Sequence, residues 1–544
     1  MVWFKRDLRT SDHAPLAKAA AHGPVVCLYI FEPELLKSPE YAHVHHRFIL
    51  ESLRDLGTDL AERGGRLTVC LGEAVEVLEG LRSRLGPFTL WSHEETGNRL
   101  TYDRDLRVKD WVRSTCTCWH EEAQNGVIRP LKRRDGWAAA WRATMQRPLT
   151  TAPSALRPGP RLPSLTPGEV QALAERYQVG GAPKPEAHGG GAKLGRTCLD
   201  SFLNERGQDY RRAMSSPLHG WDGCSRLSPH LAWGTLSLRE VAHASAARQW
   251  HITSALRAQG VGSRRRAPRA QTTLPLAAER AGSVSPEVER LERWQASLKS
   301  FESRLAWHCH FMQKLEDEPA IEFNNMNRAF DGLREHAFNE SYFEAWCSGT
   351  TGFPMVDACM RALHLGGWIN FRMRAMLASF AAYHLWLHWR RPAVFLASHF
   401  IDFEPGIHFS QFQMQSGVTG INTLRIYSPA KQVRDQDPEG VFIKRYLPEL
   451  AGVPKAFIDN PSAMPPALQQ RIGCVIGKDY PAPIVNAGQA AFSAQARIRA
   501  FRRRPEVRAA SAQVFERHGS RRGPARGRRP KPLEPHPPQL NLDD

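Results

Sequence analysis

Residues 25–31 read VVCLYIF, an uninterrupted apolar run about as long as a single strand. Such a run is typical of a strand that is buried on both faces of a sheet. Residues 67–71 and 88–91 are two further apolar runs, and helical periodicity lies between such runs, as at 45–63. Strands that alternate with helices predict a doubly wound parallel sheet. We therefore expect an α/β domain over residues 1–130, with a ligand at the carboxyl ends of its strands.

A connector and a helical half follow the predicted sheet. Residues 146–194 are rich in proline and glycine, which is typical of a linker, although 167–177 could hold one short helix. We place the interdomain linker at 131–196. From 197 to 501 the pattern is mainly helical and lacks regular strands, which predicts a larger all-α domain.

Two segments have the composition of disordered chain. Residues 259–285 interrupt the helical half with Arg264, Arg265 and Arg266, followed by polar low-complexity sequence. Residues 502–544 are predicted to be a basic, mostly disordered tail that contains HGSRRGPARGRRPKP. Its arginines could hold a polyanion, but a solvated tail explains them equally well.

Length and charge bound the class of protein. The 544 residues are too many for one hydrophobic core, and no apolar run of about 18 residues marks a membrane span. The opening MVWFKRDLRT carries charge where a signal peptide needs an apolar stretch, so a cytoplasmic location is expected. The formal net charge of +18 favours a polyanionic partner through phosphate contacts.

The cysteines and histidines do not predict a metal site. Ten cysteines are scattered without a CxxC pair, which predicts free thiols in a reducing compartment. Cys116, Cys118 and His120 could meet a metal on one face of a strand, but structural zinc needs a fourth ligand, and none is evident. His308 and His310 would point apart on a helix.

Three blocks in the helical half carry a family resemblance. They are residues 224–240 (CSRLSPHLAWGTLSLRE), 351–380 (TGFPMVDACMRALHLGGWINFRMRAMLASF) and 402–450, which ends in RIYSPAKQ…DPEGVFIKRYLPEL. The N-terminal VWFKRDLRTSDHAPL contributes a fourth match. In this order along the chain they resemble the photolyase/cryptochrome family. The resemblance implies that the helical domain binds FAD.

The polar turn before an apolar helix at 224–228 is the expected site of the FAD phosphates. Hydroxyls and backbone N–H groups at a helix start suit a pyrophosphate, and a simple N-cap is the alternative. The residues that the resemblance assigns to this site are Tyr210, Cys224, Ser225, Arg226, Leu227 and Ser228.

Arg372 and Arg374 stand two residues apart, so on a helix their side chains point about 200° apart. One of them can face inward, where an arginine needs a carboxylate partner. The family pattern supplies Asp402 for Arg374, beside the flavin, and leaves Arg372 facing a DNA lesion. Trp307 and Trp368 would frame the lesion pocket. Two surface arginines and two core tryptophans are the alternatives.

The chain departs from the family pattern where the lesion is contacted. Arg304 and His308 stand where photolyases usually have Glu and Arg, and Phe371 stands where they have Asn, with Asn370 one position earlier. Arg304 could contact a phosphate, and His308 could donate a proton or a hydrogen bond near the flavin or lesion. Since Asn370–Phe371 lacks the paired histidines of (6-4) photolyases, cyclobutane dimers are the expected lesion.

Glu404 and His408 would lie near the flavin, where the family usually has Asp and Asn. His408 could tune flavin protonation, or it could be a core histidine whose nitrogens bond backbone groups.

The family's electron-transfer tryptophans are changed as well. Trp389 matches the middle member, while Phe412 and His336 occupy the other two positions. Tyr383, Trp386 and Trp389 recur at i, i+3 and i+6, so they could share one helix face and form a substitute route. Ordinary core packing is the alternative.

The function that these features favour is that of a deoxyribodipyrimidine photo-lyase on ultraviolet-damaged duplex or single-stranded DNA. Reduced FAD would pass a light-driven electron to a flipped-out cyclobutane pyrimidine dimer. A blue-light photoreceptor without repair activity and a DNA-binding protein with a vestigial flavin fold are the alternatives. The N-terminal domain is expected to hold an antenna pigment, such as folate, deazaflavin or another flavin, near Asn98 and Asp105. A monomer is expected.

Overall fold

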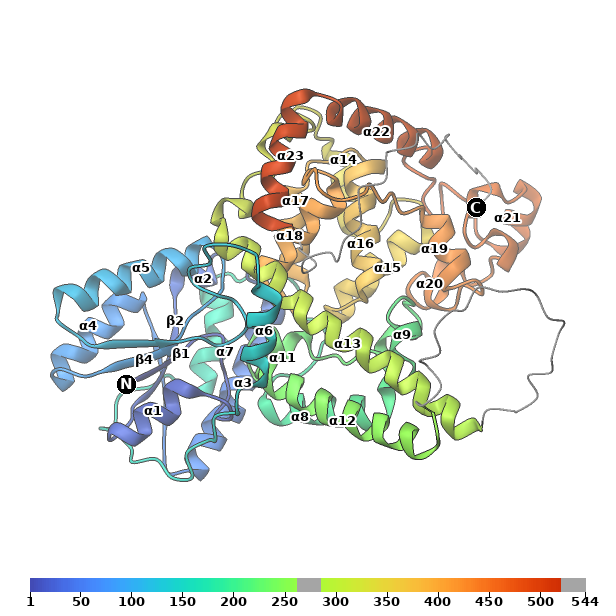
Figure 1. Ribbon diagram of the computed structural model, residues 1–544. Coiled ribbons are helices and arrows are strands. Elements are labelled where there is room, and N and C mark those ends of the chain that lie inside the picture. Colours follow the sequence, from blue (N-terminus) through green and yellow to red (C-terminus); the bar gives the residue numbers. More distant parts are fainter. Residues whose placement is uncertain (262–284, 520–544) are drawn as a thin grey trace.

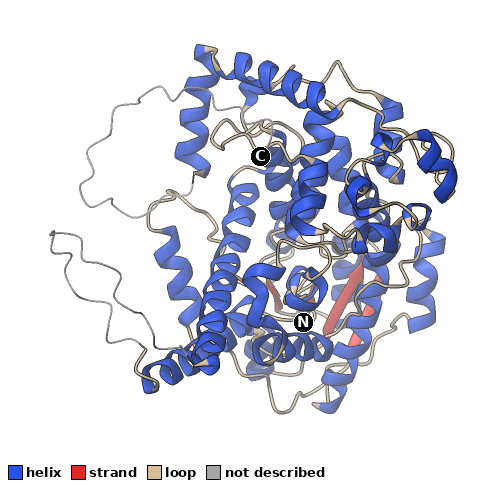
Figure 2. Cartoon of the chain, turned by 90° about the vertical axis from the view of Figure 1, so that its right-hand side faces the viewer, coloured by secondary structure: helices blue, strands red, loops and turns tan. Residues whose placement is uncertain are grey.

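The computed structural model describes residues 1–261 and 285–519, which form a sheet-containing part and a larger helical part (Figure 1). Figure 2 shows that the strands lie together in one region and that helices make up most of the remaining described chain. The predicted insertion around Arg264, Arg265 and Arg266 and residues 520–544 of the predicted tail lie outside the described residues.

The N-terminal part is a parallel sheet of five strands in the order β3-β2-β1-β4-β5. This confirms the doubly wound α/β prediction. The strand predicted at 67–71 is confirmed, and those predicted at 25–31 and 88–91 begin two residues later, at 27 and 90. The elements are β1 (Val2–Phe4), α1 (Ala14–His22), β2 (Cys27–Phe31), α2 (Pro33–Leu36), α3 (His43–Glu62), β3 (Leu67–Leu71), α4 (Ala74–Leu85), β4 (Leu90–His93), α5 (Arg99–Ser114) and β5 (Trp119–Glu122).

Alternate side chains of the strands pack into separate cores on the two faces of the sheet. Trp3 and Leu28 belong to a core with α4 and α5. Phe4 and Tyr29, the next residues along the same strands, belong to a core with α1 and α3. Successive strand side chains point to opposite faces, so this division is what a sheet covered on both sides requires.

The rest of the described chain is helical, and none of its helices is both long enough and apolar enough to cross a bilayer. The elements are α6 (Trp137–Gln146), α7 (Pro167–Arg176), α8 (Ala192–Asn204), α9 (Tyr210–Ala213), α10 (Gly220–Gly223), α11 (Ser228–Ala232), α12 (Leu238–Ala258), α13 (Pro286–Asp317), α14 (Glu340–Ser348), α15 (Pro354–Gly366), α16 (Phe371–Ser379), α17 (Arg390–His399), α18 (Pro405–Ser416), α19 (Pro429–Gln436), α20 (Val441–Tyr446), α21 (Pro466–Ile472), α22 (Ala487–Arg502) and α23 (Pro505–His518).

The segment predicted as a linker, 131–196, is a packed connector. Helix α7 confirms the short helix expected there. Trp137 and Met145 of α6 are buried in a core of the helical half, and Leu156 and Val170 are buried in the core on one face of the sheet. Proline and glycine predict a connector here, but they do not reveal that it packs on both parts.

The C-terminal boundary differs from the prediction. Helix α23 lies inside the segment 502–544 that was predicted to be mostly disordered. Val507 and Val514 are buried in the main helical core, and the fully buried His518 has its Nε2 2.7 Å from Glu318 Oε2. The prediction is wrong up to residue 518, because two apolar residues at helical spacing give this basic segment a buried side.

Local signals set the helix ends that position the site. α12 starts with a capping box, in which Ser237 Oγ accepts the N–H of Glu240 and Glu240 Oε2 accepts the N–H of Ser237. α15 begins with a proline and ends at Gly367, whose φ of 67° suits glycine. This left-handed residue ends the helix and turns the chain into Trp368.

Candidate functional site

An arginine–aspartate pair joins α16 to the segment that precedes α18. Arg374 on α16 donates from Nη1 to Asp402 Oδ1 and from Nη2 to Oδ2, both at 2.9 Å, and from Nε to the Ile369 carbonyl at 2.8 Å. Asp402 is buried, and such a two-pronged pair fixes both position and orientation. The predicted pairing is confirmed. Arg372 keeps a buried Nε without a partner in the described structure.

The turn at 224–228 is strained at its centre. Arg226 has a φ of 59°, which is rare for a residue other than glycine. Arg206 holds the turn by donating to the carbonyls of Cys224 at 2.5 Å and Ser225 at 3.4 Å. The sequence analysis missed Arg206, which stands outside the motif. α11 has only five residues, so an anion here would depend on side chains more than on a helix dipole.

Trp368 joins this turn to the ion pair. Its Nε1 donates to Ser228 Oγ at 3.3 Å, and the Arg374 guanidinium lies 6.0 Å from the centre of its ring. Trp221 packs edge-on against Trp368 at 5.8 Å, and the Arg226 guanidinium lies 5.3 Å from the Trp221 ring. The Nε of Arg226 is buried without a partner among the described residues. Two segments far apart in the sequence thus meet at one site.

Three of the residues predicted for the FAD phosphates anchor the turn in the hydrophobic core. Tyr210, Cys224 and Leu227 are buried together in the core that includes α12 and α13. Burial raises the pKa of the Cys224 thiol to about 12, so this side chain is neutral. These residues shape the site without offering it a charge.

Glu404 and His408 are both enclosed near the ion pair. The Nε2–H of His408 donates to the Ala393 carbonyl at 2.7 Å, and its ring lies 5.1 Å from that of Phe412. Burial lowers the pKa of His408 to about 4, so the imidazole is neutral at pH 7. Burial also raises the pKa of Glu404 to about 7, against the effect of Arg6, which lies 3.9 Å away.

Arg304, Trp307 and Phe371 form an exposed group. The Arg304 guanidinium lies 5.9 Å from the Trp307 ring and 5.5 Å from the Phe371 ring. Trp307 is 43% exposed and Phe371 is 47% exposed, far more than core aromatics are. A flat, open and cationic surface can stack on a base and contact a phosphate. Asn370 lies apart from it, buried, with its Nδ2 donating to the Met214 carbonyl at 3.2 Å.

His308 does not belong to the exposed group of Arg304, Trp307 and Phe371. It lines a cavity between the two parts of the molecule, together with Arg6, Met312 and Glu404. Burial and the neighbouring Arg6 lower its pKa to about 4. Arg6 also donates to the carbonyls of Ala232 at 2.8 Å and Phe403 at 2.5 Å, so it ties the sheet to the helical half.

Comparison with known proteins agrees with this architecture. Residues 1–133 match the DNA photolyase family, and residues 301–500 match the FAD binding domain of DNA photolyase. A cryptochrome DASH from Gloeobacter violaceus is 30% identical, over 91% of this chain and 95% of its own. The chain belongs to the photolyase/cryptochrome family.

Other relatives are named as photolyases. A deoxyribodipyrimidine photo-lyase from Agrobacterium fabrum is 27% identical, over 90% of this chain and 95% of its own. The crystal structure of a bacterial class III photolyase from Agrobacterium tumefaciens superposes with a TM-score of 0.73 at 25% identity, covering 92% of this chain and 97% of the other.

The aromatic residues predicted as an electron route are not on one helix face. α16 ends at Ser379, the π-helical turn Phe380–His384 follows, and Trp386 has a φ of 54°. These turns break the 3.6-residue repeat, so the predicted shared face is wrong. Tyr383 and Trp386 instead flank the guanidinium of one arginine, Arg334, at 5.7 and 4.5 Å.

Trp389 is buried apart from this pair. Its Nε1 donates to Asn325 Oδ1 at 2.8 Å, and its ring lies 6.4 Å from that of Phe409, the neighbour of His408. Of the other two family positions, His336 is exposed and Phe412 is buried.

A second cavity lies at the carboxyl ends of the strands, where the α/β pattern predicts a ligand. Arg104 inside it is buried and paired with Glu32 at 2.7 Å, Glu95 at 2.6 Å and Asp105 at 2.9 Å. Asn98 lines the cavity and caps α5. The arginine's charge is therefore matched within the protein. Aromatic walls complete the lining, among them Trp3, Tyr29, Phe31, Tyr41, Trp233 and Phe403.

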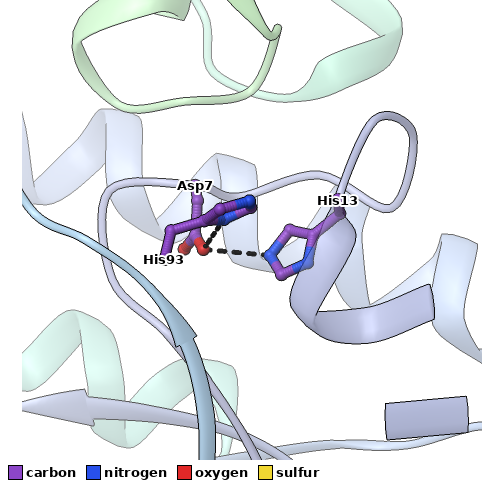
Figure 3. A group of neighbouring side chains, drawn as sticks. All are labelled: Asp7, His13 and His93. Atoms are coloured by element: carbon purple, nitrogen blue, oxygen red, sulfur yellow. Dashed lines mark hydrogen bonds and ion pairs between the residues drawn. The ribbon is translucent and has the colours of Figure 1, made fainter. Parts of the chain in front are cut away.

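One group in the described chain brings three potential metal ligands together, namely Asp7, His13 and His93 (Figure 3). Asp7 Oδ2 lies 2.9 Å from His13 Nε2 and 2.7 Å from His93 Nδ1. His13 Nδ1 accepts the N–H of Leu16 at 3.1 Å, so the ring proton is on Nε2 and points to Asp7. A protonated nitrogen does not ligate a metal, and the group is a buried hydrogen-bond network that caps α1.

Cys118 and His120 are exposed, with Sγ and Nε2 3.2 Å apart.

Proposed function

We propose that this family member repairs DNA in light, as a deoxyribodipyrimidine photo-lyase that splits cyclobutane pyrimidine dimers. The observation that carries the proposal is the exposed group of Arg304, Trp307 and Phe371, because its Phe371 lies on α16, the same helix as Arg374 of the pair with Asp402. A damaged base can stack on the open aromatics while the buried site holds a cofactor close by.

The residues of the buried site fit FAD. The Nε atom of Arg226 is buried without a partner among the described residues, although nearly all such groups in folded proteins have one. A ligand with anionic oxygens supplies this partner. Arg226, with the hydroxyls of Ser225 and Ser228, would hold the pyrophosphate. When bound and reduced, FAD supplies the light-excited electron for the reaction.

The protein's own residues would bind and orient the reactants. Arg374 and Asp402 lock each other beside the flavin, and neutral His408 adds no charge there. Trp307 and Trp368 would stack on the extruded lesion, Arg372 would face the lesion, and Arg304 would contact a phosphate. We also propose that the aromatic cavity at the strand ends holds an antenna pigment.

A repair assay tests the proposal. Purified protein is loaded with FAD, reduced, and illuminated with DNA that carries thymine dimers, and the remaining dimers are counted. We expect dimers to disappear in light and to persist in the dark. Persistence of dimers in light, while a known photolyase removes them under the same conditions, would contradict repair.

A blue-light photoreceptor is the second candidate. It is favoured by Arg304, which stands where repair enzymes of the family carry a glutamate, and by the 30% identical relative, which is a cryptochrome DASH. In the same assay a photoreceptor would retain its flavin and leave the dimers intact. A DNA-binding protein with a vestigial flavin fold would retain no flavin at all.

A further inference from the structure

A cluster of basic side chains is buried where the connector, α13 and α23 meet, outside the proposed flavin site. Arg134 of the connector is 7% exposed, Lys314 of α13 is 5% exposed, and His518 at the end of α23 is fully buried. His310, one turn before Lys314, packs its ring against Trp137 of α6 at 5.7 Å. Three segments of the chain thus bring four basic groups into one buried place.

The two carboxylates beside this cluster, Asp317 and Glu318, already have hydrogen-bond and ion-pair partners. Asp317 accepts a hydrogen bond from Gln313 at 2.8 Å and lies 3.6 Å from Arg134 Nε. Glu318 accepts from His518 at 2.7 Å and lies 2.9 Å from Arg517 Nη1. Arg134 and Arg517 therefore balance the two carboxylates, and no carboxylate of the described chain pairs with Lys314.

Two buried donors of the cluster have no partner among the described residues. These are Nη1 and Nη2 of Arg134. Lys314 makes no hydrogen bond or ion pair with the described residues, and its ammonium lies 4.8 Å from the Phe311 ring. Every pair among Arg134, His310, Lys314 and His518 is close enough for electrostatic repulsion.

Buried cations without partners are costly to the fold. Burial and Arg134 lower the pKa of Lys314 to about 7, so this amine can relieve the cost by losing its proton. Arg134 cannot lose its proton in this way, because a guanidinium keeps its charge in proteins. What remains is a buried fork of two N–H groups beside an amine, the arrangement that recognises an oxyanion.

We propose that this cluster binds one small tetrahedral oxyanion of the phosphate or sulfate class, which ties the connector to α13. Arg134 would donate to two oxygens from Nη1 and Nη2, and Lys314 would donate to a third. The burial of both side chains favours a free anion over a phosphate of the DNA backbone, which could not reach them. The site goes beyond the proposed repair function and does not depend on it.

The test compares the full-length protein with Arg134→Gln and Lys314→Met by calorimetric titration with inorganic phosphate, and by thermal unfolding in sulfate against chloride at equal ionic strength. Arg133→Gln, an exposed neighbour of Arg134, is the matched control. We expect the parent and the control to bind one phosphate per chain and to gain about 2–4 °C in sulfate. Both cluster variants should lose the binding and the gain.

Lys314→Met keeps the test decisive if Arg134→Gln does not fold. Because methionine removes a buried ammonium, this variant should be at least as stable as the parent in chloride, and lost binding then cannot be blamed on unfolding. The inference is overturned if the parent shows no saturable phosphate binding, or if Lys314→Met binds phosphate as tightly as the parent does.

Discussion

The cavity at the strand ends and the site around Arg226 use the same residue type in opposite ways. In the first, buried Arg104 is surrounded by three carboxylates and has its charge matched by the protein. In the second, Arg226 and Arg372 keep buried Nε atoms with no partner in the described structure. The fold itself balances the charge of Arg104, whereas Arg226 and Arg372 keep hydrogen-bonding capacity that a ligand can use.

The largest expected effect comes from breaking the Arg374–Asp402 ion pair, which lies in the site around Arg226. Asp402→Ala leaves Arg374 partly buried without its carboxylate, which should lower the free energy of unfolding by about 3–5 kcal/mol and release bound flavin. Glu340→Ala is the matched control, because Glu340 makes a two-pronged pair with Arg391 at 2.6 Å on the surface.

Chemical denaturation and the flavin-to-protein ratio measure both variants. The surface pair should contribute about 1 kcal/mol or less, because exposed ion pairs are weak. Equal losses in the two variants would mean that burial and the cofactor play no part in the role of Asp402.

A smaller effect is expected from Glu404, whose charge is poorly matched. The folded protein holds this carboxyl's proton up to about pH 7, whereas the unfolded chain releases it near its ordinary pKa. Stability should therefore fall as the pH rises from about 4.5 to 7. Glu404→Gln removes this loss and should be more stable than the parent at pH 8 by the order of 2 kcal/mol.

The free energies of unfolding of the parent and of Glu404→Gln, measured at pH 5 and pH 8, test the direction of this pH dependence. The gain of Glu404→Gln over the parent should be larger at pH 8. A gain that is the same at both pH values would show that the carboxyl is already ionised at pH 5 in the folded protein.

The smallest effect is expected on the exposed group. Arg304→Ala should weaken binding to dimer-containing DNA and reduce the slope of log affinity against log salt by about one, the effect of one phosphate contact. Arg290→Ala, an exposed arginine near the start of α13, is the control and should leave the slope unchanged. Fluorescence anisotropy at several salt concentrations measures both, and an unchanged slope in Arg304→Ala would exclude that contact.

The sequence predicted those features that depend on regular periodicity or on one specific pair. The strand at 67–71 and the Arg374–Asp402 pair are both present. The predicted face of Tyr383, Trp386 and Trp389 failed, because a π-helical turn and a left-handed residue interrupt the helix, and neither has a compositional signal.

Other features of the site arise only from tertiary packing. His308 lines the cavity beside Arg6 because α13 packs against the segment at Ile128 and Arg129 that follows the sheet, and nothing near His308 in sequence indicates this. Arg206 holds the 224–228 turn from 18 residues away along the chain. The order of α23 follows from two buried valines in a segment whose composition otherwise resembles a solvated tail.

The central claim is that the strained turn at Arg226 and the Arg374–Asp402 pair together enclose FAD. The most direct measurement is the blue absorbance that remains after the protein is incubated with FAD and passed through gel filtration. We predict one FAD per chain for the parent and little or none for Arg226→Ala combined with Asp402→Ala. A parent protein that stays colourless, or a double variant that keeps as much flavin as the parent, would contradict the claim.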